Sequence, residues 1–115
     1  MTHDLDYHER RAHPRVAANL RARAFYGPDH GLWADCNVVD LSQGGARLKI
    51  GQIYPLPGRF MLLQLEAGVV YEARLRWRRG DLTGVAFDGR YDIATSTSEA
   101  LARIRQTWDA LQGAK

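Results

Sequence analysis

The sequence is poor in cysteine and lacks long hydrophobic runs. Cys36 is the only cysteine, so no intrachain disulfide can form and a reducing compartment is favoured. No apolar run approaches the ~20 residues that span a bilayer. Residues 1–15 are too polar to resemble a secretory signal. We therefore expect a cytoplasmic protein that does not insert into membranes, with Cys36 as a small core or half-buried side chain.

The common catalytic and metal-binding motifs are also missing. The chain has no GxSxG elbow, no P-loop and no GxGxxG loop. His8 and Glu9 could begin an HExxH motif, but Ala12 occupies the position of its second histidine. His3, His8 and His13 do not have the usual spacing of zinc ligands. We expect a protein that is not an enzyme and holds no metal.

What is present is the composition of an ordinary globular domain. The chain has 115 residues, of which 45% are hydrophobic and 25% are charged, so it can bury one modest core. Its net charge is +3, and the positive charge comes almost entirely from arginine. Because the arginine fork pairs well with phosphates and base edges, this bias favours a phosphate-bearing ligand. It does not by itself distinguish a nucleotide from a nucleic acid.

Apolar and polar residues alternate along most of the chain, which is the period of half-buried strands. Turn residues separate the alternating segments, including the pair Ala67 and Gly68, which suits a tight hairpin. The pattern predicts six strands, at residues 16–26, 32–41, 46–50, 60–66, 69–78 and 82–88. In the fifth strand, Trp77 belongs to the apolar set, whereas Arg74, Arg76 and Arg78 belong to the solvated exterior. Six short strands joined by turns favour a mostly β protein with a closed antiparallel barrel.

The two ends of the chain break this pattern. Residues 1–15 follow neither period, so we expect a flexible N-terminal leader. Near the other end, Ser96 and Glu99 have the spacing of a capping box with Ser96 as N-cap. Apolar residues then recur at helical spacing, at Leu101, Ile104, Trp108 and Leu111. We predict a helix of about four turns that docks on the barrel, so the folded domain spans residues 16–112.

Two short polar motifs lie beside the predicted strands. Arg11 and Arg15 form an RxxxR spacing immediately before the first strand. Asp40, Ser42 and Gly45 form a [D/N]xSxxG spacing at the turn between the second and third strands. Each motif alone is common, because arginine-rich tails and structural Asx-turns also produce it. Both motifs in this order, each beside a strand, form a far rarer combination.

Together these motifs resemble the PilZ domain family. Trp77 in the penultimate strand, residues 84–87 in the last strand and the final helix extend the resemblance over residues 9–111. The resemblance implies a six-stranded antiparallel PilZ-type β-barrel with a C-terminal α-helix. It also implies a bacterial receptor for the second messenger cyclic di-GMP.

The roles that the resemblance implies fit the chemistry of this ligand, which carries two guanines and two phosphodiesters. Arg11 and Arg15 would contact a guanine edge and phosphate, since the O6 and N7 of guanine match an arginine fork. Asp40 would accept from the guanine N1/N2 edge, and Ser42 would hydrogen-bond near a phosphate or base. Gly45 would permit either a close backbone approach or a positive φ that a Cβ would block.

Three further residues are less clearly defined. Gly44 is expected near the ligand because of its place in the turn. Trp77 is either a core side chain or a wall beside the ligand, since tryptophan stacks well on bases. Arg10 is either a solvated charge or a partner of Arg11. In the family that the sequence resembles, an arginine just before RxxxR is associated with two intercalated ligand molecules, so we expect two molecules of cyclic di-GMP per chain.

The resemblance also implies a mechanism. The leader has few apolar residues, so ligand contacts would supply the free energy that orders it. The ordered leader and the ligand would then present a changed surface to an unidentified effector protein, with the receptor itself a monomer. The alternative is a small basic β-barrel that binds single-stranded nucleic acid. A third interpretation is a PilZ-like module that has lost ligand binding, but the intact Arg11, Arg15, Asp40, Ser42 and Gly45 argue against it.

Overall fold

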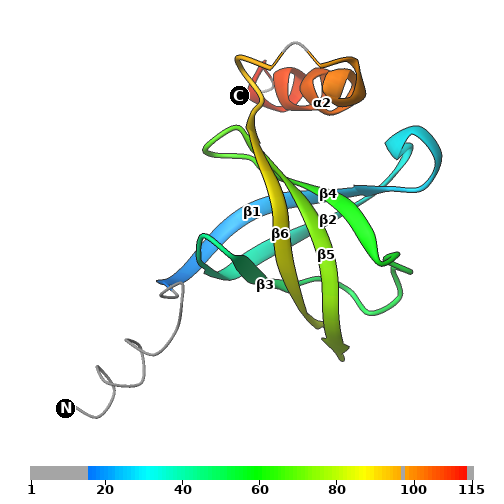
Figure 1. Cartoon of the computed structure of the whole chain (residues 1–115), viewed down its shortest axis with the longest axis vertical. Helices are drawn as coiled ribbons and strands as arrows, with labels where there is room; N and C mark the ends of the chain where they lie inside the picture. Colours follow the sequence, from blue (N-terminus) through cyan, green and yellow to red (C-terminus); the bar gives the residue numbers. More distant parts are fainter. Residues whose placement is uncertain (1–15, 97, 114–115) are drawn as a thin grey trace.

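The computed structural model describes residues 16–96 and 98–113, and the predicted leader lies outside them. Six strands form a closed antiparallel barrel in the order β1-β2-β3-β6-β5-β4 (Figure 1). The strands are β1 (Val16–Tyr26), β2 (Leu32–Leu41), β3 (Gly45–Lys49), β4 (Arg59–Gln64), β5 (Val69–Arg79) and β6 (Leu82–Asp92). Pairing of Ala22 to Phe25 in β1 with β4 closes the barrel. The mostly β fold with six antiparallel strands is therefore confirmed.

The connections between strands are short. A 3-10 helix, η1 (Pro28–His30), joins β1 to β2, and residues 50–58 form the longest loop, between β3 and β4. The β4–β5 connection spans residues 65–68, so it is longer than the two-residue hairpin predicted from Ala67 and Gly68. The side chain of Gln64 caps this turn by accepting from the amide of Ala67 at 3.1 Å. The last strand continues to Asp92, four residues beyond its predicted end.

The barrel interior is filled by the apolar residues that alternate along each strand. Ala24, Leu48 and Leu62 are fully buried there, and the rings of Tyr71 and Phe87 stack with centroids 4.0 Å apart. Because a closed barrel leaves no unpaired strand edge, backbone pairing and core packing support each other around the whole sheet.

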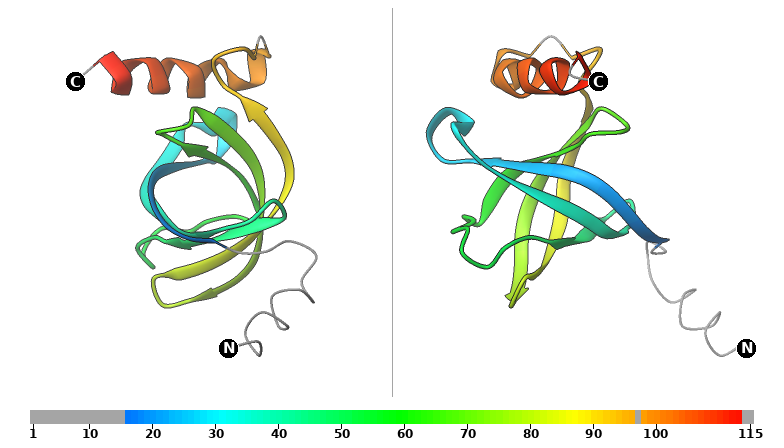
Figure 2. Two further views of the ribbon diagram at one scale, coloured as in Figure 1. Left: turned by 90° about the vertical axis from the view of Figure 1, so that its left-hand side faces the viewer. Right: turned by 180° about the vertical axis from the view of Figure 1, so that it is seen from behind.

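A second core lies between the barrel exterior and the C-terminal helix. A 3-10 turn, η2 (Glu99–Leu101), leads into α2 (Ala102–Gly113), which lies across one end of the barrel (Figure 2). Leu101 and Ile104 pack on Phe25, Leu63 and Val70, which point outward from their strands. The indole Nε1–H of Trp108 donates to the carbonyl of Leu65 at 3.1 Å. The predicted apolar stripe of the helix is thus confirmed.

The predicted N-cap of this helix is wrong by two residues. Ser98 is the N-cap, and its hydroxyl accepts from the amide of Ala100 at 3.2 Å. The hydroxyl of Ser96 instead accepts from the amide of Ser98 at 3.3 Å. With Ser98 as the cap, Glu99 is the first helical residue and stands too early for the reciprocal bond of a capping box.

A β-bulge overturns the predicted orientation of Trp77. Leu75 pairs with Val85 but Trp77 pairs with Gly84, so Arg76 is an extra residue in β5. An inserted residue reverses which face the following side chains occupy. Trp77 is consequently 41% exposed and not a core residue. Arg78, which was expected on the solvated exterior, instead donates to the backbone carbonyls of Gly51, at 3.0 Å, and Tyr54.

We predict that Ile104→Ala lowers the free energy of unfolding by about 2–5 kcal/mol, because it opens a cavity in the second core. Ile104 is fully buried, whereas the adjacent Arg103 is exposed and serves as the control. Urea denaturation of both variants measures the effect. Equal stability of Ile104→Ala and Arg103→Ala would show that the helix adds little to the fold.

Candidate functional site

The 40–45 turn is the rigid polar segment that ends β2 and begins β3. The amide and the hydroxyl of Ser42 both donate to the carbonyl of Gly45, at 2.9 and 3.2 Å. The amide of Phe87 donates to the carbonyl of Gly44 at 2.9 Å, which ties the turn to β6. Two strands therefore hold the turn in one shape, and three predicted site residues, Ser42, Gly44 and Gly45, lie together in it.

Gly45 is required for a reason other than the positive φ considered above. Among the described residues, the glycines with positive φ are Gly27, Gly68 and Gly80. A Cβ on Gly45 would instead lie 2.2 Å from the carbonyl oxygen of Val85 and 3.2 Å from the Cα of Ala86. Both atoms belong to the backbone of β6, so the close approach that requires glycine is made to a neighbouring strand.

Asp40 is buried beside the turn and paired with an arginine that the sequence analysis did not identify. Asp40 is only 6% exposed, and its Oδ2 accepts from Nε and Nη2 of Arg47 at 3.0 and 2.6 Å. The two residues are cross-strand partners in the β2–β3 pairing. The side chain of Arg47 remains 46% exposed, so part of the guanidinium faces solvent. The spacing of seven residues around a hairpin turn was the signal that could have found this pair.

Trp77 lies on the same outer face of the barrel as Arg47. Arg47 and Trp77 both pair with Gly84, from opposite sides of β6. Thr83 and Val85 are buried on either side of Gly84, so Gly84 faces outward. The indole of Trp77 covers it, since a Cβ on Gly84 would lie 2.3 Å from the Nε1 of Trp77. One row of paired positions across β2, β3, β6 and β5 therefore holds Asp40, Arg47, Gly84 and Trp77.

The predicted arginines Arg10, Arg11 and Arg15 lie outside the described residues. The strand that follows them begins at Val16, which pairs with Leu41, next to the turn. The chain therefore enters the barrel beside the 40–45 turn, as Figure 1 shows for the start of β1. Arg15, the last residue of the RxxxR motif, directly precedes β1 in the sequence.

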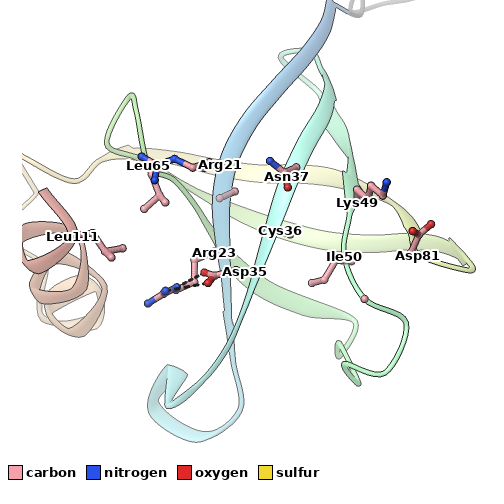
Figure 3. Close-up of a pocket in the computed structure, with 12 residues that line it drawn as sticks. Arg21, Arg23, Asp35, Cys36, Asn37, Lys49, Ile50, Leu65, Asp81 and Leu111 are labelled. Atoms are coloured by element: carbon pink, nitrogen blue, oxygen red, sulfur yellow. Dashed lines mark hydrogen bonds and ion pairs between the residues drawn. The ribbon is translucent and has the colours of Figure 1, made fainter. Parts of the chain in front are cut away.

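A separate groove of about 440 Å³ lies on the outer face of β1 and β2, bordered by Leu111 of the helix (Figure 3). Arg23 in this groove is fixed by Asp35 at 2.6 Å, and its guanidinium stacks on Trp33 at 3.8 Å from the ring centroid. None of the predicted ligand-binding residues within the described part of the chain lines the groove. Arg21, which also lines the groove, is paired with Glu66 at 3.1 Å. We therefore place the candidate site at the 40–45 turn, where the predicted polar motif lies.

Two further features bear on the chemistry. Within residues 16–96 and 98–113, no three histidine, cysteine, aspartate or glutamate side chains gather as a metal site. No helix in this part of the chain is long and apolar enough to cross a membrane.

Burial and the nearby charge of Asp35 raise the pKa of the Cys36 thiol from 9.0 to about 12, so the thiol is protonated and poorly nucleophilic at neutral pH.

A protein-family model described as PilZ domain matches residues 9–104, which includes the RxxxR motif, the 40–45 turn, Trp77 and the first three residues of α2. No curated protein matches the chain.

We predict that Gly45→Ala lowers the free energy of unfolding by about 1–3 kcal/mol, because its Cβ would overlap the backbone of β6. Gly58→Ala is the matched control, since a Cβ there would meet no atom within 4 Å. Thermal or urea denaturation of both proteins gives the comparison. An unchanged stability of Gly45→Ala would contradict the close approach of β3 and β6.

The raised pKa of Cys36 predicts the pH dependence of stability. A thiol whose pKa is raised in the folded state stabilises the protein fully below pH 9.0, and this contribution is lost as the pH rises towards about 12. The unfolding free energy of the wild type should therefore fall more steeply above pH 9 than that of Cys36→Ala. Parallel curves for the two proteins would show that Cys36 ionises as easily in the folded as in the unfolded chain.

Proposed function

Because the family model spans residues 9–104, the chain belongs to the PilZ domain family, whose members are cyclic di-GMP-binding adaptors, and we propose that it is a cyclic di-GMP receptor. The observation that carries this proposal is that three described features share one outer face of the barrel. They are the rigid 40–45 turn, the Asp40–Arg47 pair and the exposed indole of Trp77. Strand β1, which directly follows the RxxxR motif in the sequence, begins beside the turn.

Each group on this face suits one part of the ligand. The carboxylate of Asp40 accepts hydrogen bonds from the N1 and N2 edge of a guanine, and Ser42 hydrogen-bonds near a phosphate or base. Arg11 and Arg15 contact a guanine edge and phosphate. Trp77, half exposed beside Arg47, offers a flat surface on which a guanine can stack. Because Gly44 has no side chain, the ligand can approach the backbone of the turn closely.

Arg10 extends the proposal to the number of ligands. A third guanidinium next to Arg11 can pair with an additional guanine and offset the charge of a second dinucleotide. We therefore assign Arg10 to the binding of a second, intercalated cyclic di-GMP molecule. Binding supplies the free energy that orders the leader, and the ordered leader with its ligand forms the surface that an effector protein recognises.

The positions of the exposed tryptophans favour this function over binding of single-stranded nucleic acid. A nucleic-acid platform needs stacking side chains along a continuous groove. Trp33 and Trp77 are exposed, but they lie on β2 and β5, which β3 and β6 separate in the barrel. Trp33 is moreover covered on one side by the guanidinium of Arg23. The two indoles therefore do not form one surface.

Calorimetric titration with cyclic di-GMP tests the proposal. We expect binding of two molecules per chain, and a loss of affinity of about one to two orders of magnitude for Arg11→Ala or Arg15→Ala. Arg10→Ala should reduce the stoichiometry to one. Arg103→Ala, on the exposed side of α2, is the control and should bind like the wild type.

Circular dichroism checks that the arginine variants remain folded. Unaltered affinity of Arg11→Ala and Arg15→Ala would refute the role of the leader, and a wild-type stoichiometry of one would refute the role of Arg10. If the wild type does not bind cyclic di-GMP but binds oligonucleotides with a steep salt dependence, the nucleic-acid function is favoured instead.

A further inference from the structure

Gly84 lies directly beneath the indole of Trp77. A Cβ on Gly84 would lie 2.3 Å from both Nε1 and Cε2 of this indole and 2.8 Å from its Cζ2. Gly84 is not among the glycines with positive φ in the described chain, so its backbone would accept any residue. What glycine provides at this position is therefore the space that the indole occupies.

The neighbours of Gly84 differ in kind from those of Gly45. The three atoms nearest to a Cβ on Gly84 all belong to the Trp77 side chain, whereas those near Gly45 belong to the backbone of β6. A methyl group on Gly84 can be accommodated if a half-exposed side chain moves outward. A methyl group on Gly45 requires two strands to separate. Gly84 therefore controls where the indole lies, and the barrel can form without it.

The backbone next to Trp77 is held firmly, so the indole has few ways to adjust. The bulge at Arg76 turns Trp77 to the outer face. Immediately after Trp77, the guanidinium of Arg78 donates to the carbonyls of Gly51 and Tyr54 in the loop at the barrel end. Because these contacts restrain β5 on both sides of Trp77, we expect a larger residue at position 84 to turn the indole away from β6.

We infer that Gly84 is a positioning residue, which sets the height of the Trp77 indole so that a guanine can stack on it beside Arg47. This inference rests on the proposed function. Arg47 pairs with Gly84 from the other side, so the indole and the guanidinium flank the same backbone position. A side chain at position 84 would displace the indole, and with it the surface on which the guanine stacks.

A double-mutant cycle tests this role. The variants are Gly84→Ala, Trp77→Leu and the two combined, with Gly58→Ala as control because a Cβ there meets no atom within 4 Å. Stacking of a base on an aromatic side chain corresponds to a change in affinity of about 5- to 150-fold. We expect Gly84→Ala and Trp77→Leu each to weaken cyclic di-GMP binding within this range, and Gly58→Ala to bind like the wild type.

The combined variant separates positioning from a general effect on the barrel. If Gly84 acts through Trp77, the combined variant binds no more weakly than Trp77→Leu alone. The indole Nε1–H resonance of Trp77 supplies a second measurement, and its shift on ligand addition should be smaller in Gly84→Ala than in the wild type. Independent, multiplying losses of affinity would overturn the inference, as would wild-type affinity in Gly84→Ala.

The same experiments distinguish failure of the inference from failure of the proposed function. Wild-type affinity in Trp77→Leu, with the wild type still binding cyclic di-GMP, would remove the stacking role of Trp77 and leave the receptor function intact. No binding by the wild type would refute the proposed function, and the inference would fail with it.

Discussion

The candidate site depends on the close contact between the 40–45 turn and β6. Gly45 approaches β6 so closely that no Cβ fits, and the carbonyl of Gly44 accepts from the amide of Phe87. This contact brings β2 and β3, which carry the polar motif, alongside β6 and β5, which carry Gly84 and Trp77. Without it, Asp40 and Trp77 would belong to separate parts of the sheet. The glycine at position 45 thus contributes to the site by positioning strands.

Local patterns predicted most of the fold because most of its constraints are local. The period of two placed β1 and β2 within their observed bounds, and the helical spacing identified the residues of α2 that pack on the barrel. Trp77 was misplaced because a bulge shifts the period by one residue and leaves no mark in the composition of β5. The N-cap was misplaced because Ser96 and Ser98 both suit a cap, and it is Ser98 that accepts from the amide of Ala100.

The site was predicted only as far as its motifs. Asp40, Ser42, Gly44 and Gly45 lie together as expected, because a short turn keeps its members close whatever surrounds it. Arg47 and Gly84 were missed because their relation to Asp40 and Trp77 depends on the register between strands, which connects residues far apart in the chain. The roles of Arg10, Arg11 and Arg15 remain predictions, since these residues lie outside the described part of the chain.

The pairing of Asp40 with Arg47 explains how a carboxylate can serve a doubly anionic ligand. Two like charges about 4 Å apart near a protein surface repel by roughly 4 kcal/mol, so a bare carboxylate at this turn would oppose the phosphates of cyclic di-GMP. Arg47 donates two hydrogen bonds to Asp40 and offsets that charge before any ligand arrives. The carboxylate can then accept from a guanine edge at little electrostatic cost. In the proposed complex the guanidinium groups of Arg11 and Arg15 are additional to that of Arg47, and they balance the two phosphates of cyclic di-GMP.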